Sequence, residues 1–141
     1  MPELLTAFRY RVVLEGARAA AGFAECSGLE VEHELFEFAE GGQNRFVHKL
    51  PTRLRPADLV LRRGLVPVPS ELWAWIEAIG AGNYQRRGGE IRVYSADGRR
   101  SQAWRFERGI PVRWSGPALS ATQSAVAMES LTIAHEGLRA G

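Results

Sequence analysis

Apolar and polar residues alternate in short runs along most of this chain, which is the period-two pattern of half-buried β-strands. The first run extends from Phe8 to Leu14, with arginines between its apolar residues, and Gly16 ends it. Similar runs over 23–27, 59–61, 90–95, 102–108 and 110–114 are separated by turns rich in glycine or proline. This spacing predicts a mainly β protein of the sandwich or barrel type.

A long hairpin is predicted in the first half of the chain. Acidic and apolar residues alternate over 29–38, and a second run follows over 46–50. The residues between these runs that favour a turn are Gly41, Gly42, Gln43 and Asn44. We therefore expect two paired strands with a glycine-rich tip.

One segment has the periodicity of a helix. Ser70 follows a proline and is placed to cap the helix, and Glu71 suits its first turn. The apolar residues at helical spacing are Leu72, Trp75, Ile76 and Ile79. Such a short helix is unstable alone in water, so its apolar side must pack against the sheet.

The last predicted strand, over 126–135, has an unusual pattern. Val126 and Met128 fall on one face, whereas Leu131 and Ile133 fall on the other. Either a bulge intervenes or both faces are covered, and in the second case another subunit covers one of them.

Composition adds that the chain is globular and forms a single domain over residues 1–141. It has 45% apolar and 24% charged residues, with no repeat or linker. The lone Cys26 excludes an internal disulfide. No apolar run approaches the ~20 residues of a membrane span, so we expect synthesis in the cytoplasm and no membrane insertion.

Charge gives a hypothesis of another class, a basic β domain that binds nucleic acid. The pI is about 9.1, but the net charge is only +2 and the basic residues are scattered. Arginine pairs together with Trp104 and Trp114 would form such a surface. Tryptophans that alternate with arginines along strands more often lie in a core, so we expect no specific nucleic-acid binding.

No pattern in the sequence predicts catalysis, a cofactor or a metal site. His135-Glu136 lacks the second histidine of a zinc helix, because position 139 is an arginine. His33 and His48 lie in the predicted hairpin without a cysteine or carboxylate pattern around them. Cys26, in a turn-forming segment, is typical of a small buried apolar residue.

Six segments, in order, resemble the tail tube protein family of phage-like contractile injection machines. They are FAECSGLEVE (23–32), EGGQN (40–44) with KLP (49–51), LVLRRGL (59–65), LWAW (72–75), PVRWSGP (111–117) and ESLTIAHEGL (129–138). The resemblance implies two antiparallel sheets forming a barrel-like sandwich, with one short α-helix packed against it. It also implies a fold related to the ring protein of type VI secretion.

The resemblance further implies a structural subunit that assembles with itself. Hexameric rings would stack into a hollow tube with a sheath around it, a baseplate at one end and cargo in the lumen. The chain would be either the repeated tube subunit or a tube-initiating protein at the baseplate end. It would finish in an assembled particle that is released from the cell or remains part of a tail.

Two groups of residues are predicted to contact neighbouring subunits. The hairpin tip, Gly41 to Asn44, and the arginines that follow it, Arg53 and Arg55, are expected to meet the adjacent ring. A hairpin that is simply solvated is the alternative. Glu129, Leu131 and Ile133 in the last strand are expected to meet a neighbour within the ring.

Overall fold

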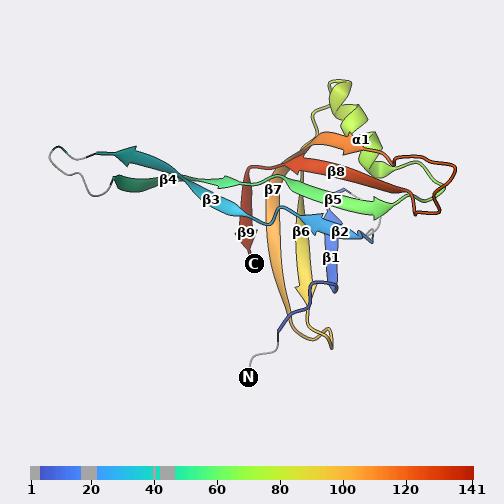
Figure 1. The fold of residues 1–141 in the computed structure, drawn as a ribbon, viewed down its shortest axis with the longest axis horizontal. Helices are drawn as coiled ribbons and strands as arrows, with labels where there is room; N and C mark the ends of the chain where they lie inside the picture. The colour runs from blue at the N-terminus through green and yellow to red at the C-terminus, as the bar shows by residue number, and fades with distance from the viewer. Residues whose placement is uncertain (1–3, 17–21, 40, 42–46) are drawn as a thin grey trace.

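The computed structural model describes residues 4–16, 22–39, 41 and 47–141. Within these residues the chain forms nine strands and one helix (Figure 1). In order they are β1 (Tyr10–Leu14), β2 (Glu25–Ser27), β3 (Val31–Phe38), β4 (His48–Pro56), β5 (Leu59–Gly64), α1 (Glu71–Gly80), β6 (Arg87–Tyr94), β7 (Ser101–Ser115), β8 (Met128–Ala134) and β9 (Gly137–Ala140).

The long strand β7 belongs to two antiparallel sheets. Its first half lies between β6 and β9, and β6 pairs with β1. Its second half pairs with β8, which continues through β5 to β2. The strands of these two sheets cross each other in Figure 1. The predicted mainly β fold is confirmed, with two antiparallel sheets and one packed helix. The path from β1 to β2 is not closed by a pairing within the described residues, so the sheets form a sandwich with open edges and not a sealed barrel.

The change of sheet along β7 has a local cause. Pairing with β6 ends at Gly109, and the register with β8 shifts between Pro111 and Arg113. Pro111 lacks a backbone N–H, so a bulge suits it, as the sequence predicts. A side chain at Gly109 would lie 2.7 Å from the Arg87 carbonyl oxygen, so only glycine fits this close approach.

The core lies between the two sheets and under the helix. The first sheet contributes Val12, Leu14, Ile91 and Phe106, the second contributes Leu59, Leu61, Leu131 and Ile133, and α1 contributes Leu72 and Trp75. The predicted cap of α1 is confirmed, because the Ser70 hydroxyl accepts a hydrogen bond from the Trp73 amide at 3.3 Å. Across the described segments, no helix is both long and apolar enough to cross a membrane.

Candidate assembly surfaces

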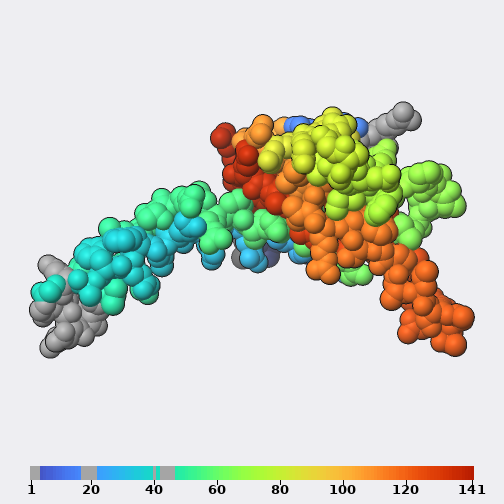
Figure 2. All heavy atoms as spheres, turned by 90° about the horizontal axis from the view of Figure 1, so that it is seen from above, coloured from blue at the N-terminus to red at the C-terminus, as the bar shows by residue number. Residues whose placement is uncertain are grey.

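Strands β3 and β4 form an arm that projects away from the sandwich. Figures 1 and 2 show the arm extending from one end of the molecule, with its base near β9. Within the described residues these two strands pair only with each other, and most of their side chains are exposed. An isolated two-stranded hairpin is at best marginally stable in water, so the arm has the character of an incomplete structure.

One face of the arm is apolar and aromatic. Phe36 lies opposite Leu50, and Phe38 lies opposite His48, with the last two rings stacked at 4.9 Å. Phe36 and Leu50 are 57% and 51% exposed. A continuous apolar surface of this kind on a protein usually marks a contact with a partner. The sequence predicts a contact at the hairpin tip but not on this face, although the spacing of Phe36 and Phe38 within the predicted strand is a signal for it.

The predicted contact residues Arg53 and Arg55 lie on the arm and pair with a glutamate of the same arm. Arg53 Nε donates to Glu34 at 2.7 Å, and Arg55 Nε lies 3.4 Å from the same carboxylate. The hydrogen bond from Arg53 holds the pKa of Glu34 below its usual value. Because these groups are exposed, their pairing contributes little to stability and leaves them available to a partner. Gly41 is exposed, while Gly42, Gln43 and Asn44 lie outside the described residues.

The other predicted contact residues, Glu129, Leu131 and Ile133, are placed differently from the expectation. Leu131 and Ile133 are fully buried in the core of their own subunit, and Glu129 is only 2% exposed. Their strand, β8, is paired on both sides, with β5 and with β7. The change of apolar face between Val126 and Leu131 has a simple cause, because β8 begins at Met128 and Val126 lies outside the strand. These side chains have no surface to offer a neighbouring subunit.

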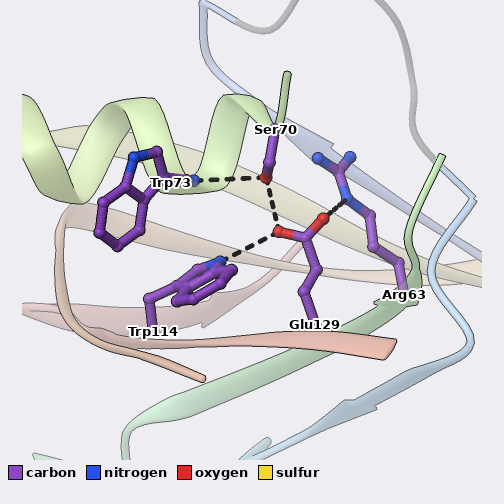
Figure 3. Close-up of polar contacts among 5 residues, drawn as sticks. All are labelled: Arg63, Ser70, Trp73, Trp114 and Glu129. Carbon is purple, nitrogen blue, oxygen red and sulfur yellow. Dashed lines mark hydrogen bonds and ion pairs between the residues drawn. The ribbon is translucent and has the colours of Figure 1, made fainter. Parts of the chain in front are cut away.

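Glu129 instead joins four elements through buried polar contacts (Figure 3). Its carboxylate accepts hydrogen bonds from the Ser70 hydroxyl at 2.5 Å and from Trp114 Nε1 at 3.1 Å. Arg63 Nε lies 3.4 Å from its other oxygen. The cluster connects the start of α1 with β5, β7 and β8, so it fixes the helix against the sandwich.

The end of the sandwich away from the arm has its own exposed apolar residues. They lie in the β5–α1 and β7–β8 connections and are Leu65, Val66, Val68, Leu119 and Val126. A hollow of about 340 Å³ beside them is lined partly by Val66, Val68 and Pro69. Both connections lie opposite the arm in Figures 1 and 2. One molecule therefore presents apolar surfaces at its two opposite ends.

The strand edges are also open. Within the described residues, β1 pairs only with β6, β9 only with β7, and β2 only with β5. The outer sides of these strands therefore have backbone N–H and C=O groups that no other described strand pairs with. Such edges invite pairing with another chain.

The histidines and the cysteine that were considered for a metal site or for catalysis do not form such a site. His33 pairs with Leu54 and His48 with Phe38, so the two histidines lie toward different ends of the arm. Burial raises the pKa of the Cys26 thiol to about 11, as suits a small side chain packed against the core. In the described part of the chain, no group of three or more potential metal ligands is present.

The tryptophans of the nucleic-acid hypothesis do not form a surface. Trp104 lies opposite the buried Ile91 on the core side of its sheet. Trp114 donates to Glu129 and packs edge-on against Trp73 at 5.0 Å. These contacts give the two side chains structural roles.

Comparison with solved structures shows the same fold in proteins of injection machines. A chain of the PVC sheath–tube complex of an extracellular contractile injection system is 21% identical, with a TM-score of 0.85, covering 98% of this chain and 91% of that chain. A chain of the anti-feeding prophage cap is 20% identical, with a TM-score of 0.87 and coverages of 100% and 93%. Hcp1 from Flavobacterium johnsoniae is 14% identical, with a TM-score of 0.64 and coverages of 95% and 95%. No curated protein sequence matches this chain.

The open edges, the apolar arm and these shared folds define a class of small β-sandwich proteins whose outer strands are unpaired within the described residues. Residues 6–139 match the family model of the T4-like virus tail tube protein gp19. The chain belongs to this family of tail tube proteins. The family resemblance expected from the six sequence segments is confirmed.

Proposed function

We propose that this chain is the repeated subunit of the inner tube of a contractile injection particle. Six copies close into a ring, and rings stack into a hollow tube that a sheath surrounds and a baseplate nucleates. The family match supports the tube role, and structures described as a sheath–tube complex and as a baseplate contain chains of the same fold. The match to the tube protein itself favours the repeated subunit over a tube-initiating protein.

The observation on which this proposal rests is the arm. Its Phe36 and Leu50 side chains stay exposed on a face where aromatic and aliphatic residues lie side by side outside the core. In a head-to-tail arrangement, the arm of one copy covers the apolar connections at the far end of the next copy. Each contact then leaves a free arm at one side and a free far end at the other, so the same contact repeats until the ring closes.

The proposed role is structural and needs no catalytic step. The chain is made in the cytoplasm and is then incorporated into the particle, and any cargo travels in the lumen. Phe36 and Leu50 are the proposed contacts within a ring. The tip from Gly41 to Asn44, with Arg53 and Arg55, remains the proposed contact with the adjacent ring.

Negative-stain electron microscopy of the full chain, produced together with its baseplate partners, tests the proposal. Tubes of stacked rings are expected for the wild-type chain. The double variant Phe36→Ser/Leu50→Ser is expected to stay monomeric, because it removes the apolar contact and leaves the core untouched. Phe8→Ser is the matched control, because Phe8 is 75% exposed and lies on neither proposed surface.

Two outcomes would contradict the proposal. A wild-type chain that forms no tube even with its baseplate partners would count against the tube role itself. Tubes formed equally well by the arm variant would show that the arm is not the contact. Circular dichroism of each variant confirms that the sandwich is still folded.

A further inference from the structure

The outer face of the first sheet is rich in arginine. Inward positions on β1, β6 and β7 hold the buried residues Val12, Ile91 and Phe106, so the residues that alternate with them point outward. We call the outward residues Arg11, Arg92, Arg105 and Arg139 the arginine face. They come from β1, β6, β7 and β9, the adjacent strands of this sheet in Figure 1.

The arginine face brings like charges together. Arg11 lies directly opposite Arg92, and Arg105 lies directly opposite Arg139. Like charges in directly opposed positions of a sheet destabilise it. The fold therefore carries a local electrostatic cost on this surface that a negatively charged partner would relieve.

The carboxylates within the face neutralise only part of this charge. Glu90 pairs with Arg92 at 2.5 Å, and Glu107 lies 3.5 Å from Arg139. Arg105 lies opposite Glu90 across β6 and β7, but within the described residues neither Arg11 nor Arg105 forms an ion pair with a carboxylate, and both are exposed. Arg11 and Arg105 therefore each offer a planar guanidinium fork that fits a carboxylate through two hydrogen bonds.

We propose that the arginine face binds an acidic segment of a protein partner. The two glutamates within the face would repel the evenly charged backbone of a nucleic acid but can pair with the basic residues of a mixed, mainly acidic polypeptide. The face also differs from the apolar ends proposed to join copies, since its only large exposed apolar residue is Val13. Exposed charge pairs of this kind are weak and salt-sensitive, which suits a contact that must be released.

Fluorescence anisotropy with a labelled poly-L-glutamate peptide tests this inference on the full chain, both free and assembled into tubes. The double variant Arg11→Gln/Arg105→Gln is expected to weaken binding on the order of tenfold. Arg62→Gln/Arg113→Gln is the matched control, because it removes the same charge from the other sheet and is expected to bind like the wild type. A single-stranded DNA oligonucleotide of equal net charge is the competing ligand.

Each other outcome overturns the inference. Equal losses of peptide affinity in both double variants would show an effect of net charge alone. If the wild-type chain does not bind the peptide, the arginine face does not bind an acidic segment. Tighter binding of the DNA would assign the face to nucleic acid. Binding by the free chain but not by tubes would show that another copy covers the face. None of these results requires the tubes to fail, so the inference and the proposed function are tested separately.

Discussion

Replacement of Glu129 by glutamine tests whether the buried polar cluster holds the helix against the sandwich. Glu129→Gln keeps the shape of the side chain but removes its charge and turns one acceptor atom into a donor. The carboxylate is 2% exposed and accepts from Ser70 and Trp114, with Arg63 beside its other oxygen. The amide can satisfy only part of this set of donors and leaves the 16% exposed Arg63 side chain without its counter-charge.

The expected loss of stability follows from these contacts. A hydrogen bond to a charged group contributes about 1.5–3 kcal/mol, and a buried partner left unsatisfied adds a cost of similar size. We expect Glu129→Gln to lower the free energy of unfolding by about 3 kcal/mol. For a domain of this length that corresponds to a fall in Tm of about 10 °C.

The assay is urea unfolding followed by tryptophan fluorescence, at a concentration low enough to keep the chain monomeric. Glu107→Gln is the control, because Glu107 is 51% exposed and its ion pair is long, so a change below about 0.5 kcal/mol is expected. Ser70→Ala combined with Glu129→Gln should cost less than the two single changes added together, since both belong to one network. A stability of Glu129→Gln within about 0.5 kcal/mol of the wild type would refute the assigned role of the cluster.

Further predictions concern the switch in β7 and the single thiol. Gly109→Ala should lower the free energy of unfolding by more than about 2 kcal/mol in the same assay, because the new Cβ meets the Arg87 carbonyl oxygen. Gly137→Ala is the control and should change the free energy of unfolding far less, because no described atom lies within 4 Å of its new Cβ. A pKa of about 11 leaves only about a thousandth of the Cys26 thiol ionised at pH 8. A thiol reagent should therefore label the native chain far more slowly than the chain unfolded in urea. Equal labelling rates would contradict the burial of Cys26. The same raised pKa makes stability fall as the pH rises from about 9 to 11, since the unfolded chain ionises first, and Cys26→Ala should remove that part of the pH dependence measured by thermal melts.

Local patterns predicted most of the elements of this fold. The positions of β1, β5, β6 and α1, and the cap at Ser70, follow from alternation, turn residues and helical spacing within each segment. The strand β9 was missed, because Gly137–Ala140 is too short to show a period. The runs over 102–108 and 110–114 predict two separate strands, whereas one strand continues from Ser101 to Ser115 with a bulge after Pro111.

The contact residues were harder to predict, because burial depends on distant parts of the chain. Glu129 was expected to meet a neighbouring subunit, because its strand has apolar residues on both faces. It is buried in its own subunit instead, where Ser70, 59 residues away in the sequence, donates one of the hydrogen bonds to its carboxylate. The apolar residues of the arm follow the same alternation as a core strand. Only the structure shows that no other part of the described chain covers them.

The shared strand β7 has a mechanical consequence. Load applied to one sheet passes to the other along covalent bonds of a single backbone, and the two layers cannot shear apart by slipping hydrogen bonds alone. Bending at the crowded glycine between them is opposed by close packing on both sides. A stack of such subunits would therefore transmit an axial force through rigid subunits, and any deformation along the stack would occur at the contacts between subunits.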